Sequence, residues 1–150
     1  MMNILITVAH PDDETIGMGG TIKKLSKNNE ITLCVMTDGA SAQYDGKKMI
    51  KVRQDACKKA GKILGISKFH FLNFPDMKLD SISHVEMNKE LEKIIKKFNP
   101  KILYSTSYND LNKDHQKVFE SCSVISRPIS SKIKKFLCFE MGGRNKIPFN

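Results

Sequence analysis

The stretch ILITVAHPDDETIGMGG, residues 4–20, joins an apolar segment to a histidine, a proline, three acidic residues and three glycines. Its first part is rich in β-branched residues without alternation, which is typical of a strand buried on both faces of a parallel sheet. Pro11 ends that strand because proline has no N–H to give to a sheet. Apolar residues then recur at helical spacing, so the stretch predicts a strand, a sharp turn and a helix start.

The acidic residues decide what this turn can bind. Asp12, Asp13 and Glu14 stand where a pyrophosphate would have to lie in a dinucleotide site, and the glycines do not match G-x-G-x-x-G. Acids at a helix start are also ordinary capping residues. Because His10 accompanies them at the carboxyl end of a strand, where α/β folds place ligands, we favour a cation-binding site.

The composition predicts one compact unit. The chain has 150 residues, 40% of them hydrophobic, which suits a single domain over residues 1–150 with a substantial core. Its first apolar run is too short for a signal or transmembrane segment and ends in acids, so we expect a cytoplasmic protein. The four cysteines form no C-x-x-C pair, which predicts reduced thiols and neither a disulfide framework nor a zinc ribbon.

The net charge of +9 raises the question of an anionic partner. Nearly all of the basic residues are lysines, and Arg53, Arg127 and Arg144 are the only arginines available for bidentate contacts to bases or phosphates. The lysines are spread in pairs such as Lys23-Lys24, as on solvated helix faces. The charge therefore argues against nucleic acid and leaves an anionic substrate or a lipid headgroup as the milder inference.

Further apolar runs predict four more strands, at residues 31–37, 69–74, 101–106 and 134–140. Helical spacing fills the segments between them, for example at Val52, Ala56, Ala60 and Ile63. Gly65 is a typical stop for that helix, and Ser83 with Glu86 fits a capping box at the start of the next. Alternating strands and helices predict an α/β, Rossmann-like three-layer sandwich with a mostly parallel sheet and its site at the C-terminal strand ends.

Three polar clusters fall at those strand ends, at residues 10–14, 37–39 and 109–115. His115 lies in the last of them, after several acidic and amide residues. If the first and fourth strands are neighbours, His10, one nearby aspartate and His115 can meet at one point. Two imidazoles and a carboxylate suit zinc or iron(II) and leave a position open for water, which predicts a metallohydrolase.

The stretch AHPDDETIGMGGTI, residues 9–22, closely resembles the signature of the PIG-L/LmbE-like de-N-acetylases. Weaker matches follow in the order of the family: residues 37–39 (TDG), the helix from Arg53 to Gly65, residues 74–79 (FPDMKL) and Asp114-His115. The resemblance extends from residue 4 to about residue 120. It implies a metal-dependent hydrolase, most simply a zinc-dependent N-deacetylase with Fe²⁺ as the other possible ion.

The resemblance also implies roles for individual residues. The metal ligands would be His10, Asp13 and His115. Asp12 would act as general base, in a catalytic set that also contains Asn112 and Asp114. Weaker candidates for contacts to the substrate are Glu14, Arg53 and Asp76. The implied substrate is an N-acetylglucosamine-type glycoconjugate, sugar nucleotide or glycolipid intermediate, which would be hydrolysed to a free amine and acetate.

Two features depart from the family pattern. Asn112 stands where the family commonly has a histidine; its amide can donate a hydrogen bond to an oxyanion, worth about 3 kcal/mol, but cannot supply a proton. Family members also usually continue well beyond the fifth strand, so we expect a domain truncated at its C-terminus, with an open sheet edge that favours a homo-oligomer. The alternative is a catalytically degenerate member that binds a sugar or a partner chain.

Overall fold

The computed structural model describes residues 1–44, 47–128 and 132–141. Within these ranges the strands are β1 (Asn3–Val8), β2 (Glu30–Thr37), β3 (Lys68–Phe74), β4 (Ile102–Thr106) and β5 (Lys135–Phe139). The helices are α1 (Asp13–Leu25), α2 (Lys47–Leu64), α3 (His84–Phe98) and α4 (Lys113–Ile125), with a short 3₁₀ turn η1 (Leu79–Ser81). Each strand begins and ends within one residue of its predicted run, and each helix lies between two predicted strands, whereas η1 was not predicted.

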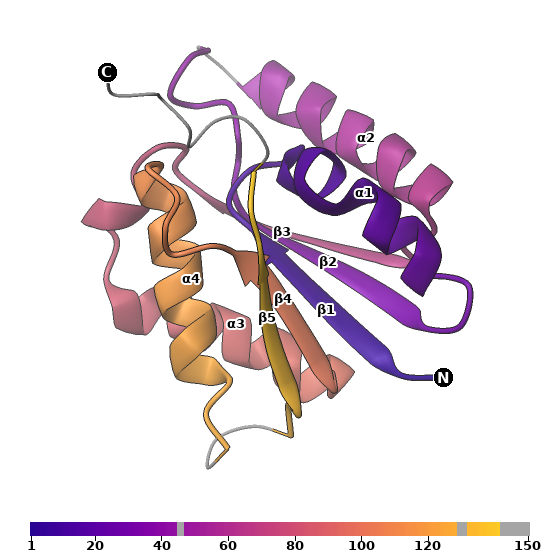
Figure 1. Cartoon of the computed structure of the whole chain (residues 1–150). Coiled ribbons are helices and arrows are strands. Elements are labelled where there is room, and N and C mark those ends of the chain that lie inside the picture. The colour runs from indigo at the N-terminus through magenta and orange to yellow at the C-terminus, as the bar shows by residue number, and fades with distance from the viewer. Residues whose placement is uncertain (45–46, 129–131, 142–150) are drawn as a thin grey trace, which may run out of the picture.

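All five strands pair in parallel in the order β3-β2-β1-β4-β5. The central strand β1 aligns Leu5 with Thr32 of β2 and with Leu103 of β4. Helices α1 and α2 cover one face of the sheet, while α3 and α4 cover the other (Figure 1). The chain therefore has the three-layer α/β fold that the sequence predicts, and β1 and β4 are neighbours.

Two apolar clusters fill the spaces between the sheet and the helices. On one face, Ile4 and Ile6 of β1 pack with Ile22 of α1 and Cys57 of α2. On the other face, Leu5 of the same strand belongs to the cluster built by α3 and α4. Strand β1 thus buries successive residues on opposite sides, which is why its sequence shows a continuous apolar run rather than alternation.

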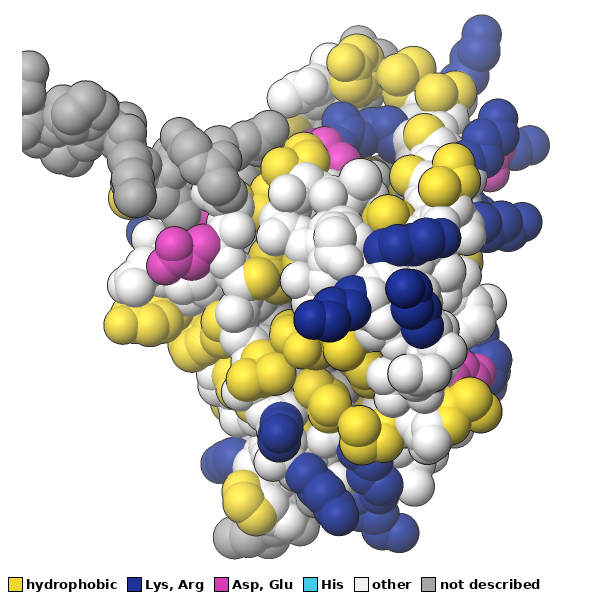
Figure 2. Space-filling view, turned by 45° about the vertical axis from the view of Figure 1, so that its right-hand side comes forward, with side chains coloured by type: hydrophobic (Ala, Val, Ile, Leu, Met, Phe, Trp, Pro, Cys, Tyr) yellow, Lys and Arg dark blue, Asp and Glu magenta, His cyan; other side chains and the backbone are white. Residues whose placement is uncertain are grey.

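Helix α2 forms as its spacing predicts, but most of its predicted apolar stripe lies outside. Val52 is 49% exposed and Ile63 is 73% exposed, whereas the buried residues of the helix are Cys57 and Gly61. A Cβ atom on Gly61 would collide with the Phe69 ring of β3, so the small residue lets the helix approach the sheet. Figure 2 shows apolar side chains among Lys and Arg side chains on the side of the molecule that carries α1 and α2.

The capping box predicted at the start of α3 needs correction, and the glycines of α1 differ in how closely they are packed. Ser83 precedes α3 as predicted, but its side chain forms no capping hydrogen bond; its backbone carbonyl accepts the N–H of Glu86 instead. In α1, only Gly17 is required by close packing, because a Cβ atom there would collide with the Phe139 ring of β5. Gly20, by contrast, has open space around it.

The two ends of the sheet order are edge strands, β3 and β5. No described strand pairs with the outer side of β5, where Leu137 and Cys138 are exposed. The remaining three cysteines are buried thiols, and none of the four is in a disulfide. Among the described helices, none has a stretch long and apolar enough to span a lipid bilayer.

Candidate metal centre and active site

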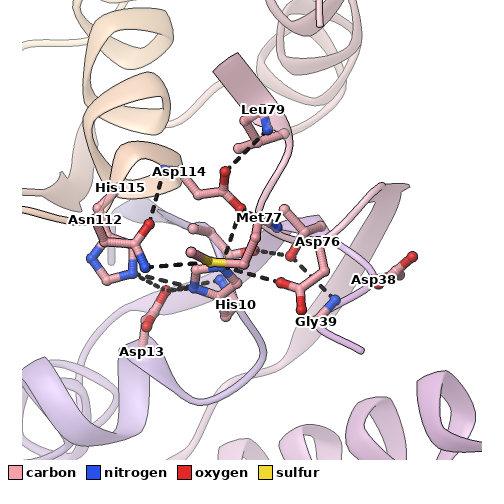
Figure 3. A network of polar contacts seen from close by, with 12 residues as sticks. His10, Asp13, Asp38, Gly39, Asp76, Met77, Leu79, Asn112, Asp114 and His115 are labelled. Atoms are coloured by element: carbon pink, nitrogen blue, oxygen red, sulfur yellow. Dashed lines mark hydrogen bonds and ion pairs between the residues drawn. The ribbon is translucent and has the colours of Figure 1, made fainter. Parts of the chain in front are cut away.

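The strand order brings together two segments that lie more than 100 residues apart in the chain. His10 follows β1, and His115 lies in the first turn of α4, directly after the loop from β4. The Nδ1 atom of His10 is 3.2 Å from Nε2 of His115. Asp13, the first residue of α1, places its Oδ2 atom 3.4 Å from the former nitrogen and 3.3 Å from the latter (Figure 3).

These three atoms are spaced as ligands of one ion. In a tetrahedral site with metal–ligand bonds of about 2.0–2.2 Å, neighbouring ligand atoms lie roughly 3.3–3.6 Å apart. The observed separations of 3.2–3.4 Å among His10, Asp13 and His115 are close to that range. The donor set of two imidazoles and one carboxylate suits zinc or iron(II), so the residues fit a divalent ion.

Both imidazoles are oriented by a carboxylate on the side away from the ligand group. Nδ1–H of His115 donates to Oδ2 of Asp110 over 2.7 Å, and Nε2–H of His10 donates to Oδ2 of Asp114 over 3.2 Å. When both rings are neutral in these tautomers, as metal binding requires, the remaining nitrogen of each ring can bind an ion. Without an ion, that nitrogen can carry a proton that bonds to Asp13. Such outer carboxylates fix the tautomer and raise the basicity of a metal-binding histidine.

Asp110 contacts the candidate ligand group although the sequence did not single it out. It is buried, and its second oxygen accepts the backbone N–H of Asn112 over 2.9 Å. Its position five residues before His115 was visible in the polar loop, but so were several other acids and amides. Only the turn into α4 shows which of them faces the ring.

The same contacts shift the pKa values of the group. Burial alone would lower the pKa of His10, but hydrogen bonds and charge attraction from Asp114 and Asp13 outweigh it and raise the pKa to about 10. Burial would raise the pKa of Asp13, yet the bonds to His10 and His115 hold it far below its ordinary value. The charges thus compensate one another, and a divalent ion would take the place of the imidazole proton.

Asp114 also fixes the loop that follows β3. Its Oδ2 atom accepts the backbone N–H of Met77 over 2.8 Å, and its Oδ1 atom accepts that of Leu79 over 3.0 Å. Met77 has a left-handed backbone with φ of 56°, a conformation that few non-glycine residues adopt. The aspartate therefore holds a strained loop against the start of α4 (Figure 3).

A second set of possible ligands shares His10. Asp76 places its Oδ1 atom 3.3 Å from Nε2 of His10, on the same side as Asp114. Both oxygens of Asp114 accept backbone N–H groups, and Oδ2 of Asp13 accepts the backbone N–H of His10 over 2.8 Å. The first set offers two imidazoles, which suit zinc or iron(II), whereas the second offers one. The set of His10, Asp13 and His115 is therefore the better cation site.

Six of the nine predicted site residues line a cavity of about 340 Å³, whereas Glu14, Asp114 and His115 do not. Its wall consists of His10, Asp12, Asp13, Gly39, Gln43, Arg53, Asp76, Met77 and Asn112. Asp12 has the most accessible carboxylate of the opening motif, at 45% exposure, and its Oδ2 atom lies 3.3 Å from Nη2 of Arg53. Gln43 belongs to this wall although no sequence motif selected it, and Met77 belongs to it as part of the FPDMKL segment without having been singled out.

The two ends of the Asn112 amide group face different parts of the structure. Its side-chain oxygen accepts the backbone N–H of Asp114 over 2.9 Å and so caps the start of α4. Its amide nitrogen lies on the cavity side, 3.7 Å from Sδ of Met77. The residue therefore offers a hydrogen-bond donor to the cavity, while its oxygen is committed to the helix.

Glu14 lies behind the cavity rather than in its wall. It is 0% exposed, and its Oε1 atom accepts hydrogen bonds from Oγ1 of Thr15 and Sγ of Cys57. Burial raises the pKa of its carboxyl group. Because Cys57 belongs to α2, this contact joins α1 to α2 and does not face a ligand.

The cluster at residues 37–39 builds the turn beside the candidate ligands His10 and Asp13. Thr37 donates through Oγ1 to the carbonyl of Ala9, and Asp38 accepts the backbone N–H groups of Ala40 and Ser41. Gly39 has φ of 65°, and a Cβ atom there would collide with the Pro11 ring. The glycine thereby leaves room for the turn that carries His10 and Asp12.

Comparison with known proteins agrees with this fold. The family model described as GlcNAc-PI de-N-acetylase, PIG-L, matches residues 5–125. Diacetylchitobiose deacetylase of Thermococcus kodakarensis is 35% identical over 105 residues, which are 67% of this chain and 39% of that protein. A probable N-acetyl-alpha-D-glucosaminyl L-malate deacetylase 2 of Bacillus anthracis is 26% identical over 111 residues, 69% of this chain and 49% of that protein.

A solved structure shows the same arrangement. The N,N'-diacetylchitobiose deacetylase of Pyrococcus horikoshii superposes with a TM-score of 0.73 and 29% sequence identity, covering 87% of this chain and 52% of its own. The chain therefore spans about half the length of these relatives. Since the family model covers most of the chain, including both segments that build the ligand group, the protein belongs to the PIG-L family of de-N-acetylases.

Proposed function

We propose that this chain is a metal-dependent hydrolase that removes the acetyl group from an N-acetylglucosamine-type compound. The observation that carries the proposal is the triangle of His10 Nδ1, His115 Nε2 and Asp13 Oδ2, with sides of 3.2–3.4 Å. Two of these residues, His10 and Asp13, also line a cavity. Zinc is the favoured ion for this donor set, and Fe²⁺ is the alternative. The relatives support the reaction, because their names describe deacetylation of N-acetylglucosaminyl compounds.

The bound ion would act as a Lewis acid that polarises the acetyl carbonyl. Among the described residues, the Asp12 carboxylate forms an ion pair only with Arg53. This carboxylate is therefore free to take a proton from the attacking water. It then returns that proton to the departing amine nitrogen. Asn112 would donate its amide N–H to the oxygen that becomes negative during the attack.

Some of the other predicted residues would contact the substrate, and others would orient the residues that bind the ion. Arg53 and Asp76 line the cavity and are placed to contact the sugar. Asp114 keeps His10 in the tautomer that leaves Nδ1 free, which is a positioning role, and Asp110 does the same for His115. Glu14 holds α1 against α2 and would act through the position of Asp13 rather than by touching substrate.

The test combines a substrate panel with two substitutions. Protein loaded with Zn²⁺ or Fe²⁺ is expected to release acetate from N-acetylglucosamine, N,N'-diacetylchitobiose or N-acetylglucosamine 1-phosphate. Asp12→Asn should keep the metal and lose about 100-fold to 10,000-fold in rate, because a positioned general base is removed. Asp13→Asn should weaken metal binding instead, because a neutral amide is a poorer ligand than a carboxylate.

The same measurements can reject the proposal. Stoichiometric metal in both variants, with unchanged acetate release, would show that the opening motif is only a capped helix start. Metal binding without acetate release from any compound of the panel would favour the binding-module alternative. A loss of metal in Asp12→Asn but not in Asp13→Asn would reverse the two roles.

A further inference from the structure

A second cavity of about 350 Å³ lies beside the first. It is lined by Asp38, Lys47, Ile50, Lys51, Gln54 and Asn73. Its wall and that of the catalytic cavity use neighbouring residues of the same two segments. Gly39 lines the catalytic cavity next to Asp38, and Arg53 lines it next to Gln54.

The second cavity has a different charge from the first. Lys47 and Lys51 are one helical turn apart in α2, and Gln54 follows on the same side, so these side chains share one face of the helix. Within the described residues, no carboxylate forms an ion pair with either ammonium group. The cavity therefore offers two cationic donors and two amides.

Asp38 is the single acidic residue of this wall, and its charge is partly satisfied. Its Oδ1 atom accepts the backbone N–H groups of Ala40 and Ser41, each over 2.9 Å. Its side chain is buried at the end of β2. The positive groups consequently outnumber the negative one, and they are the more accessible.

The catalytic cavity, by contrast, has a wall whose carboxylates repel anions everywhere except next to the proposed metal ion. Asp12, Asp13 and Asp76 all contribute carboxylates to its wall, with Arg53 as the cation opposite Asp12. A negatively charged part of a substrate would avoid these carboxylates and would gain from the two lysines next to them. Ammonium groups bind phosphate and carboxylate through charge-assisted hydrogen bonds.

We infer that the cavity around Lys47 and Lys51 binds an anionic substituent, a phosphate or a carboxylate, of the amino sugar whose N-acetyl group occupies the catalytic cavity. The inference rests on the proposed function and narrows the class of substrates. The enzyme selects N-acetylglucosaminyl compounds that carry a negative charge on the part of the molecule beyond the reacting ring.

The experiment compares charged and uncharged substrates with the metal-loaded chain. Values of kcat and KM for acetate release are measured on neutral N,N'-diacetylchitobiose, on N-acetylglucosamine 1-phosphate and on N-acetylglucosaminyl malate. The phosphate and malate compounds distinguish the two anion chemistries. The variant is Lys47→Ala/Lys51→Ala, and the control is Lys59→Ala, an exposed lysine of α2 outside the cavity.

We expect the double variant to raise KM for at least one anionic compound by about tenfold or more, because charge-assisted contacts are lost. The value of kcat, and all values for the neutral compound, should stay unchanged. Calorimetric binding of N-acetylglucosamine 1-phosphate should weaken in the double variant and not in Lys59→Ala. Raised salt should reduce the difference between parent and double variant.

Other outcomes overturn the inference or the proposed function separately. Equal KM values for charged compounds in parent and double variant, with acetate still released, would overturn the anion subsite and leave the deacetylase intact. A KM increase of the same size for neutral and charged compounds would also overturn it. Absence of acetate from every compound would reject the proposed function, and calorimetry would then still decide whether the lysines bind the anion.

Discussion

Replacing Asp110 by asparagine tests whether the buried carboxylate orients His115. The Oδ2 atom of Asp110 is 2.7 Å from Nδ1 of His115, and its Oδ1 atom accepts the N–H of Asn112. In Asp110→Asn, the amide oxygen can keep the bond to Asn112, so its NH₂ group then faces the ring. To accept a hydrogen bond from this NH₂ group, Nδ1 of His115 must be unprotonated. The proton of the ring then moves to Nε2, which removes the lone pair that would bind the ion.

The expected loss follows from the change of tautomer. Mutation of outer partners of metal-binding histidines typically costs 10–100-fold in affinity, which is about 1.4 to 2.8 kcal/mol. The assay is competition of the apoprotein with a fluorescent Zn²⁺ chelator at fixed pH. Asp80→Asn is the matched control, because Asp80 is an exposed aspartate of η1 with the same change in charge.

Two results would refute this reasoning. An affinity for Zn²⁺ equal to that of the parent would mean that Asp110 does not determine the tautomer of His115. An equal loss in Asp80→Asn would mean that net charge, and not the contact to the ring, controls the affinity. Circular dichroism of both variants shows whether either has lost its fold.

Four shorter predictions concern stability, thiols and association. Asn112→His should lower the free energy of unfolding by about 1 kcal/mol, because it removes the cap of α4; acetate release should not fall, and a large loss would mean that the asparagine is adapted to this site. Gly17→Ala should destabilise by about 1 to 2 kcal/mol through collision with Phe139, whereas Gly20→Ala should stabilise by up to about 1 kcal/mol; urea titrations giving both the same sign would contradict the packing of α1. Cys138 should be the one thiol that reacts quickly with a disulfide reagent in the native protein, with all four reacting in denaturant; rapid reaction of buried thiols would show that the core opens. The unpaired side of β5 should make the apparent mass rise with concentration in light scattering, and a constant monomer mass would argue against association through this edge.

The fold could be predicted from the sequence because the strands of a parallel sheet have a simple hydrophobic pattern. Strands buried on both faces need apolar residues at every position, and β1 and β2 meet that need almost without interruption. The buried face of α2 was not accessible in the same way. Its contact with β3 requires a small residue at Gly61, and its other buried residue, Cys57, contacts Glu14 of α1. A rule based on apolar spacing selects large residues such as Ile63 instead.

The site shows a similar division. The structure brings His10, Asp13 and His115 together as the family resemblance implies, and their role as ligands stays a prediction. The three consecutive acids could not be told apart by chemistry alone. Asp12 precedes α1 with a non-helical backbone and lines the cavity. Asp13 and Glu14 are successive residues of the helix, about 100° apart, so Asp13 faces the histidines and Glu14 the neighbouring helix.

The contact between His10 and His115 closes a loop of 105 residues, which makes the ligand group a product of the folded chain as a whole. An ion bound there would tie the end of the first strand to the start of the last helix, and so act on the unfolded ensemble in the manner of a long-range cross-link. Neither half of the polypeptide holds all three ligands, so a growing chain gains its full affinity only after residue 115 has been made. The concentration of the metal ion would then set the thermal stability of the domain through linkage. A lack of the ion would expose the whole domain to proteolysis and would not merely abolish its activity.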